Sequence, residues 1–317
     1  MGSDPSRNHS AITLKRMDTF VAHLIYVLAA VIARIPWPLQ RRLSRSIGRL
    51  YFRRNTRLAR ATRRNMELIE VGADPQERSR LALGVLQSTV LQAFETLRFW
   101  TRSPARNLKS IAKVHGEALL DDAIATGNGV ILAAPHYGSW ELLNQWLAHK
   151  TPIAILYAPS GSDVGDAFLN LVRGGDRVTQ VRADGATGVR TLLRILKQGG
   201  VIGILPDQQP KVGDGEYAPF FGYPALTMTL LSKLAIKTQA PVLMAYCERA
   251  DVEVPSYEIH IEPADADIHN ADIGESVAAL NRSVESVARR DLLQYQWTYK
   301  RFTKQVCDNN PYYPDCY

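Results

Sequence analysis

The sequence predicts an α/β fold with a mostly parallel sheet flanked by helices. Short apolar runs of strand length alternate with stretches of helical periodicity from about residue 130 onward. The 317 residues, 46% of them apolar, are enough for one large domain with a sizeable core. The predicted strands are Val130–Ala134, Ile153–Tyr157, Val178–Arg182, Val201–Leu205, Val242–Tyr246 and Tyr257–Ile261.

The predicted helices fill the segments around these strands. Ahead of them, Asp74-Pro75-x-Glu77 has the cap, proline and acid of a helix start, and this helix is expected to run to about Trp100. Because helices and strands alternate, we expect helices on both faces of the sheet. The later predicted helices are Ser139–His149, Val164–Val172, Gly188–Lys197, Thr227–Thr238 and Asp272–Arg289.

An apolar run precedes the domain. It spans Phe20–Ala33, 14 residues interrupted only by His23. As a helix it would be about 21 Å long, shorter than a hydrocarbon core of about 30 Å. We therefore expect a membrane-associated helix that is embedded, tilted or lying at the interface, with Trp37 at headgroup level. A buried core helix is the alternative.

The next segment, residues 34–64, is strongly basic. It holds eleven arginines and no acid, whereas the whole chain has a formal net charge of only +7. Apolar residues recur among the arginines at helical spacing, which predicts a basic amphipathic helix against an anionic membrane surface. A solvated face is the alternative. Nucleic acid is disfavoured because no nucleic-acid-binding module accompanies the arginines.

Four segments follow from these patterns. Residues 1–16 are polar and expected to be disordered, residues 17–64 hold the apolar and basic helices, residues 65–304 form the α/β domain, and residues 305–317 are a polar and aromatic tail. The three cysteines, Cys247, Cys307 and Cys316, do not form a disulfide framework. Neither Cys-x-x-Cys nor His-x-x-x-His spacing occurs, so no metal site is expected.

Two polar clusters follow predicted strands, where ligands bind in open α/β sheets. In the first, PHYGSWE, His136 directly follows a strand and Glu141 lies five residues later. If the Glu141 carboxylate bonds one ring nitrogen of His136, it fixes the tautomer, and the other nitrogen can accept a proton from a substrate hydroxyl. The alternative is an ordinary histidine at a strand end.

The second cluster, PDQQP, contains Asp207, which could orient an arginine or a substrate group, or simply cap a turn. Arg173 lies at a predicted helix end, where a cation also has a capping role. No Gly-x-Ser-x-Gly elbow is present, so a serine hydrolase of the common α/β type is disfavoured. Neither glycine-rich nucleotide loop is present.

Taken in order, the motifs resemble those of the lipid A late acyltransferases, the lauroyl and myristoyl transferases of lipopolysaccharide biosynthesis. The resemblance covers most of the chain from about residue 20 to 304. The matching stretches are RNMEL at 64–68, GNGVILAAPHYGSWELL at 127–143, GGVIGILPDQQP at 199–210, APFFGYPALTMT at 218–229 and QYQWTYKRF at 294–302.

This resemblance implies a glycerolipid-acyltransferase-like fold at the cytoplasmic face of the bacterial inner membrane, with residues 65–304 as the acyltransferase domain. It implies an acyl carrier protein (ACP) thioester as donor, a lipid A precursor hydroxyl as acceptor, and no cofactor. His136 would be the general base and Glu141 its partner, with Arg173 and Asp207 as substrate-binding residues. The chain departs from the family pattern near Arg173, where Tyr157-Ala158-Pro159 stands in place of the more usual Tyr-Arg.

Other functions stay open at this point. The acceptor could be another lipid, such as a lysophospholipid, an ornithine lipid or a mannosylated phosphatidylinositol. The chain could also be a non-catalytic membrane-surface protein, or a thioesterase that uses water as acceptor. An acyl-chain site needs an apolar floor, for which the candidates are Trp140, Trp146, Phe220, Phe221 and Met228.

Overall fold

The computed structural model describes residues 5–303 except for six single positions, and it describes side chains from residue 17 onward. The tail expected at residues 305–317 lies outside the described residues. The six positions are Val71, Ala73, Ser160, Asp184, Val212 and Val252.

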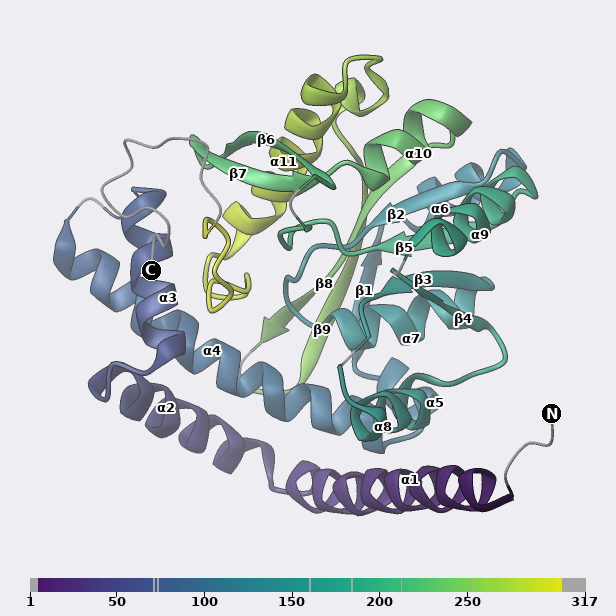
Figure 1. Ribbon diagram of the computed structural model, residues 1–317. Coiled ribbons are helices and arrows are strands. Elements are labelled where there is room, and N and C mark those ends of the chain that lie inside the picture. Colours follow the sequence, from purple (N-terminus) through teal and green to yellow (C-terminus); the bar gives the residue numbers. More distant parts are fainter. Residues whose placement is uncertain are drawn as a thin grey trace.

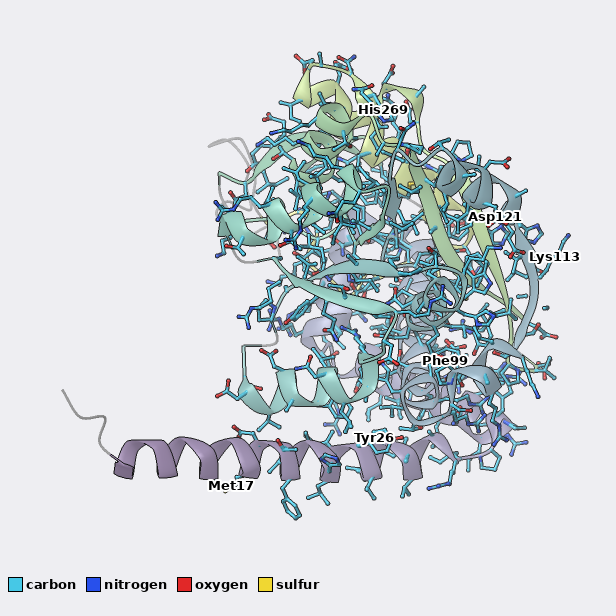
Figure 2. All side chains as sticks on the ribbon, turned by 90° about the vertical axis from the view of Figure 1, so that its right-hand side faces the viewer. Met17, Tyr26, Phe99, Lys113, Asp121 and His269 are labelled. Atoms are coloured by element: carbon cyan, nitrogen blue, oxygen red, sulfur yellow. The ribbon has the colours of Figure 1, made fainter. Side chains whose placement is uncertain are left out.

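The N-terminal part of the chain is a layer of helices. It comprises α1 (Pro5–Ala33), α2 (Trp37–Arg53), α3 (Arg57–Leu68), α4 (Pro75–Thr101) and α5 (Pro104–Leu108). α1, α2 and α3 all pack against α4, and α1 also contacts α8 (Asp163–Arg173). α1 lies along the outer edge of the molecule in both views (Figure 1, Figure 2).

The start of α1 differs from the expectation. The helix begins at Pro5, inside the segment 1–16 that we expected to be disordered. Proline suits the first turn of a helix, because its missing N–H would have no partner there. No glycine or proline follows until after Ala33, so nothing in the sequence interrupts the helix.

No described helix is by itself long and apolar enough to cross a membrane. Met17–Ala33 and Trp37–Arg53 satisfy the length and composition criteria together, but they are bent by 104° relative to each other.

The central sheet has seven strands in the order β1-β9-β8-β2-β5-β3-β4. All neighbours are parallel except the antiparallel pair β8 and β9, so the predicted mostly parallel α/β sheet is confirmed. The strands are β1 (Ile111–His115), β2 (Val130–Ala133), β3 (Ile153–Tyr157), β4 (Val178–Arg182), β5 (Val201–Ile204), β8 (Val242–Asp251) and β9 (Ser256–Pro263).

A separate hairpin of β6 (Gly215–Phe220) and β7 (Tyr223–Met228) was not predicted. It takes up the first residues of the helix predicted at Thr227–Thr238, which is observed as α10 (Leu230–Thr238). The remaining helices are α6 (Glu117–Ala125), α7 (Trp140–Lys150), α9 (Gly185–Lys197), the short 3₁₀ helix η1 (Ala266–His269) and α11 (Ile273–Arg290).

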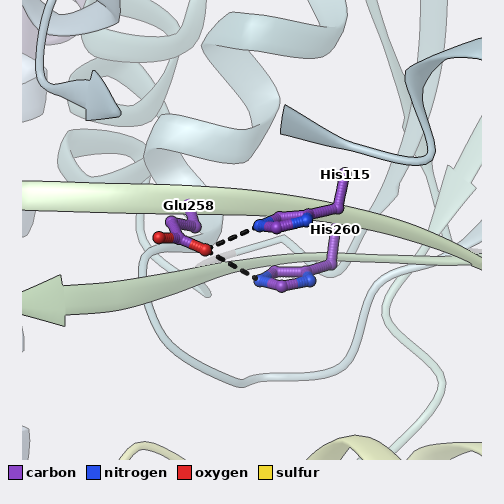
Figure 3. A group of neighbouring side chains, drawn as sticks. All are labelled: His115, Glu258 and His260. Carbon is purple, nitrogen blue, oxygen red and sulfur yellow. Dashed lines mark hydrogen bonds and ion pairs between the residues drawn. The ribbon is translucent and has the colours of Figure 1, made fainter. Parts of the chain in front are cut away.

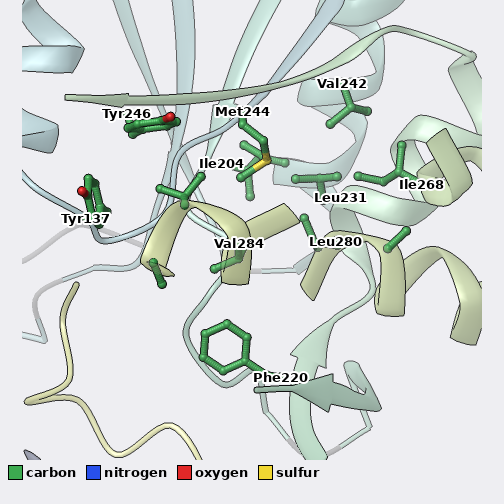
Figure 4. Packing of buried hydrophobic residues seen from close by; sticks show 14 of the residues in the cluster. Tyr137, Ile204, Phe220, Leu231, Val242, Met244, Tyr246, Ile268, Leu280 and Val284 are labelled. Atoms are coloured by element: carbon green, nitrogen blue, oxygen red, sulfur yellow. The ribbon is translucent and has the colours of Figure 1, made fainter. Parts of the chain in front are cut away.

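Helices cover both faces of the sheet, and strand alternation assigns the faces. In β2, Val130 and Leu132 pack with α6 and α7 on one face, whereas Ile131 and Ala133 pack with α9, α10 and α11 on the other. Figure 4 shows the second face, where Leu231 of α10 and Leu280 and Val284 of α11 meet the strands. The expected helices on both faces are therefore confirmed.

A buried ion pair joins the helical layer to the sheet. Glu95 of α4 is fully buried and accepts hydrogen bonds at 2.7 Å from both Nε and Nη2 of Arg249 on β8. The hydroxyl of Tyr257 on β9 donates to the same carboxylate at 2.8 Å. The buried carboxylate of Glu95 thus has hydrogen-bond donors on both oxygens, and the buried guanidinium has its counter-charge. Removing one partner would leave the other charge buried without compensation.

Replacing Glu95 by Ala should lower the free energy of unfolding by about 3–5 kcal/mol, because Arg249 is left buried without its carboxylate. Denaturant unfolding followed by circular dichroism measures the loss. Arg282→Ala is the control, since Arg282 forms ion pairs at the surface and its loss should cost about 1 kcal/mol or less. Equal losses in the two variants would contradict the structural role of the buried pair.

Candidate active site

Two neighbouring parallel strands bring His136 and Asp207 together. Ala133 at the end of β2 pairs with Ile204 at the end of β5. His136 and Asp207 each lie three residues beyond that pair, as the last residues of the matching segments AAPH (133–136) and ILPD (204–207). Since both strands run in the same direction, their next residues leave the sheet side by side at the edge where ligands bind.

The His136 imidazole is held by Asp207 and Trp140. Its Nδ1 lies 2.8 Å from Oδ1 of Asp207, and the backbone N–H of His136 donates to Oδ2 of the same carboxylate at 2.9 Å. The Trp140 ring packs edge-on against the imidazole, with 5.2 Å between centroids. An ionised carboxylate only accepts, so Nδ1 carries the proton and Nε2 keeps a free lone pair.

The environment keeps Asp207 ionised. Burial acts to raise the pKa of Asp207, but the electrostatic attraction to the His136 ring and the hydrogen bonds from its ring and backbone outweigh this, and the pKa is lowered. Burial and a hydrogen bond to Asp207 raise the pKa of Tyr295 well above its ordinary value, so its hydroxyl stays protonated as a donor. Asp207 is therefore a fixed negative charge behind the imidazole.

Glu141 does not take the place expected for it. The carboxylate on Nδ1 of His136 belongs to Asp207, whereas Glu141 pairs with Arg173. The Nε of Arg173 donates to Oε1 of Glu141 at 3.1 Å, and its Nη2 contacts the same oxygen. Glu141 lies in the first turn of α7, and its side chain faces Arg173 at the end of α8. The carboxylate next to His136 is that of Asp207, which follows β5.

The turn between His136 and α7 is fixed by close backbone contacts. Gly138 has φ +55°, and a Cβ there would lie 2.0 Å from the carbonyl oxygen of Cys247, so only glycine fits. The N–H of Gly138 donates to the Gln294 carbonyl at 3.0 Å, and that of Ser139 to the Cys247 carbonyl at 2.7 Å. These two N–H groups are thus already used by the fold.

The segment 294–302 closes over the site from the other end of the chain. The N–H of Gln296 donates to the His136 carbonyl at 3.0 Å, and Tyr295 forms a β-bridge with Tyr137. Asn65 anchors the segment, because its amide donates to the Trp297 and Tyr299 carbonyls at 2.7 and 2.8 Å. The RNMEL and QYQW motifs therefore support the site together.

Two glutamines next to the imidazole were not among the predicted site residues. The Nε2 of Gln208 lies 3.2 Å from Nε2 of His136 and donates to Oε1 of Gln296 at 3.3 Å. Gln208 follows Asp207 directly, so its position in PDQQP was the available signal. Gln296 is 160 residues from His136, and no local pattern linked them.

A cavity of about 1590 Å³ opens at His136. Trp140, Glu141, Arg173 and Gln208 line it near the histidine, and Trp140 and Met228 were predicted to do so as part of the apolar floor. The other expected floor residues, Trp146, Phe220 and Phe221, lie instead in the hydrophobic core. The apolar walls come from β3, β7, α8, α9 and α10 and include Leu156, Val172, Val189, Leu193, Met228 and Leu234.

The arrangement supports proton transfer beside an apolar chamber. Nε2 of His136 is the basic atom, Asp207 fixes its tautomer, and the Arg173 guanidinium is a cation at the cavity wall. The described side chains with metal-ligand geometry are His115, Glu258 and His260, and none of them lines this cavity.

Comparison with known proteins adds a family match. Residues 7–304 match the model of the bacterial lipid A biosynthesis acyltransferase family. The chain is 22% identical to the lipid A biosynthesis lauroyltransferase of Escherichia coli (strain K12), over 86% of this chain and 88% of the relative. It is 25% identical to the lipid A biosynthesis palmitoleoyltransferase of the same organism, over 88% and 90%. It is also 25% identical to a phosphatidylinositol mannoside acyltransferase of Mycobacterium tuberculosis (strain CDC 1551 / Oshkosh), over 63% and 67%.

The lowered pKa of Asp207 has a consequence for stability. A carboxylate with a lowered pKa in the folded state stabilises the protein fully above its unfolded pKa, near 3.8, and loses that contribution as the pH falls through the folded value. Asp207→Asn should therefore cost on the order of 1–3 kcal/mol at neutral pH, and the difference from wild type should shrink below about pH 4. Denaturant unfolding across pH 3–7 measures both curves, and a difference that grows on acidification would refute this ionisation state.

Proposed function

The chain belongs to the bacterial lipid A biosynthesis acyltransferase family, and on that premise we propose that it transfers a fatty acyl chain from ACP to a hydroxyl of a lipid A precursor. The observation that carries the proposal is the His136–Asp207 pair at the wall of a large cavity with apolar sides. At about 1590 Å³ the cavity exceeds the roughly 300–1,000 Å³ typical of small-ligand pockets. It therefore has room for a long acyl chain beside the acceptor.

His136 acts as general base in this proposal. Nε2 takes the proton of the acceptor hydroxyl while the hydroxyl oxygen attacks the thioester carbonyl and forms a tetrahedral intermediate. When the C–S bond breaks, the thiolate leaves and the imidazolium returns the proton to sulfur. The products are a new ester and a free carrier thiol, and no cofactor takes part. Asp207 holds the imidazole in the required tautomer and stabilises its charged form.

Gln208 marks the position of the acceptor hydroxyl. Its amide nitrogen lies 3.2 Å from the catalytic Nε2 and donates towards it, as a substrate hydroxyl would. Gln296 accepts from the same amide and can hold Gln208 aside. Binding of the acceptor therefore requires Gln208 to move away from Nε2.

Arg173 is the proposed binding group for negative charge. Its guanidinium is held by the buried carboxylate of Glu141 and lies on the cavity wall. The N–H groups of Gly138 and Ser139 are already bonded within the fold, so a side-chain cation is the better candidate for the developing oxyanion or for a lipid phosphate. Glu141 then positions Arg173 rather than His136.

We also propose that the enzyme works on an anionic membrane surface, at the cytoplasmic face of the bacterial inner membrane. One face of α1 carries exposed apolar side chains at helical spacing, including Met17, Phe20, Leu24, Val27, Leu28 and Val31. The opposite face, with Ala22, Ala29 and Ala33, is buried. Exposed arginines of α2 and α3 follow along the chain, and these features support an interfacial helix beside anionic headgroups.

A different lipid acceptor is the second candidate. The similarity to a phosphatidylinositol mannoside acyltransferase favours testing it, because the same base and cavity could serve another hydroxyl. Lysophospholipid and mannosylated phosphatidylinositol acceptors therefore belong in the same assay.

Purified protein with ACP thioesters of several chain lengths and a tetra-acylated lipid A precursor should give a product heavier by one acyl group, read by mass spectrometry. His136→Ala should lower kcat/KM by about 10²–10⁴-fold, the usual contribution of a positioned acid–base group. Asp207→Asn should lower kcat with little change in KM. Glu141→Gln should act through Arg173, raising KM if Arg173 binds a lipid phosphate and lowering kcat if it binds the developing oxyanion.

Each variant is first checked for an unchanged circular dichroism spectrum. If Glu141→Gln lowered kcat as Asp207→Asn is expected to, while Asp207→Asn had no effect, Glu141 and not Asp207 would be the partner of His136. Product formed only with the other lipids would assign the second candidate acceptor.

Membrane binding can be tested on the exposed face of α1. Phe20 and Leu24 are 70% and 60% exposed, so replacing both by Asp should greatly reduce sedimentation with vesicles containing anionic phospholipid. High salt should weaken wild-type binding, because screening shortens the reach of the arginines. Ala125→Asp is the matched control, since Ala125 is exposed on α6, away from α1 in Figures 1 and 2. Equal loss in both proteins would contradict the role of α1.

A further inference from the structure

Two histidines and a glutamate meet on one face of the sheet, outside the cavity described above. His115 ends β1 and pairs in register with His260 of β9. Glu258 lies two residues before His260, so strand alternation puts both side chains on the same face. Figure 3 shows the three side chains together, with both imidazoles directed at the Glu258 carboxylate.

The three ligand atoms lie close enough to share one ion. Nε2 of His115 is 2.6 Å from Oε2 of Glu258, and Nε2 of His260 is 3.9 Å from the same oxygen. All three atoms lie within 4.8 Å of one another. The two rings are stacked, with 4.4 Å between centroids and 9° between planes.

His260 supplies an independent observation. Its side chain is only 7% exposed, and its Nε2 makes no hydrogen bond, although carboxylate oxygens of Glu248 and Glu258 lie 3.5 and 3.9 Å from it. Buried polar nitrogens are nearly always satisfied, and leaving one unpaired costs about 1–3 kcal/mol. The nitrogen points at the Glu258 carboxylate (Figure 3), at a distance that allows an ion pair but no hydrogen bond. A ligand between the two groups would satisfy it.

We propose that this cluster binds a divalent transition-metal ion of the zinc type, through Nε2 of His115, Nε2 of His260 and an oxygen of Glu258. Two imidazoles and one carboxylate form a ligand set that zinc accepts, with water completing the tetrahedron. Metal–ligand bonds of about 2.0–2.2 Å put tetrahedral ligand atoms about 3.3 Å apart. The present separations of 2.6 and 3.9 Å bracket that value, so binding requires the stacked rings to tilt while the strands stay in place.

The surroundings are compatible with a cation. The side chains of His115 and Glu258 are about one-third exposed, which gives an ion access from solvent. Arg290 and Lys113 are nearby positive charges, and Arg290 is paired with Glu248 and Glu262.

The ion would link the edge strand β1 to its neighbour β9. β1 is the outermost strand and pairs only with β9 within the described sheet. A metal shared by His115 and the two β9 residues adds a cross-link between these strands. It should therefore act on stability, and this inference does not depend on the acyl-transfer reaction.

Zinc binding to the purified full chain tests the proposal. Cys307 and Cys316 are replaced by Ser in every protein so that tail thiols do not compete, and any affinity tag is removed. Equilibrium dialysis should give one zinc per chain, and Co²⁺ should give the visible absorption of a tetrahedral site. Zinc should also raise the melting temperature by a few degrees, because it binds only the folded state.

His115→Gln and Glu258→Gln are the principal variants, because both side chains are partly exposed and the fold should tolerate the changes. Each should weaken zinc binding at least about tenfold and abolish the thermal shift. His149→Gln, at an exposed histidine of α7, is the matched control and should bind like the parent. No bound zinc in the parent, or equal binding by the parent and His115→Gln, would overturn the proposal.

Discussion

The parallel pairing of β2 with β5 is the constraint on which the site depends. Two segments with the same pattern, VILAAPH and VIGILPD, leave the sheet in register, and their last residues are His136 and Asp207. The backbone N–H and ring nitrogen of the histidine both reach the one carboxylate. Because two strands fix this contact, the imidazole is oriented before any substrate arrives, which lowers the cost of reaching the reactive geometry. Trp140, Gln208 and the segment 294–302 then pack around an imidazole that is already in position.

Much of this fold could be predicted from the sequence, and so could the two polar clusters at the strand ends. The partner of His136 could not. Local spacing favoured Glu141, five residues away, because a single sequence shows distances along the chain and not the order of strands in a sheet. Asp207 was recognised as a polar residue of the site, but its place beside His136 required the knowledge that β2 and β5 are neighbours. The β6–β7 hairpin was missed because residues 215–226 were assigned to no element, and Thr227 and Met228 at the end of β7 were predicted as the start of a helix, which periodicity does not distinguish over so short a run.

The same limit applies to the groups that join distant elements. Glu95 and Arg249 come from α4 and β8, and His115 and His260 from β1 and β9, so neither pair leaves a short-range spacing to detect. Residue types gave no warning either, since single charged residues and single histidines are common in any sequence. In each pair a charged or polar group is buried, and its requirement for a partner became visible only once burial was known.

The contacts of segment 294–302 have a consequence for the protein during its synthesis. Three backbone contacts of residues 136–138 are made with residues that the ribosome adds more than 150 positions later. They involve the His136 carbonyl, the Gly138 N–H and the β-bridge of Tyr137. A growing chain therefore has His136, Asp207 and the two strands that pair them before residues 294–302 are added around them. These contacts around His136 can therefore form only after residues 294–296 have been synthesised.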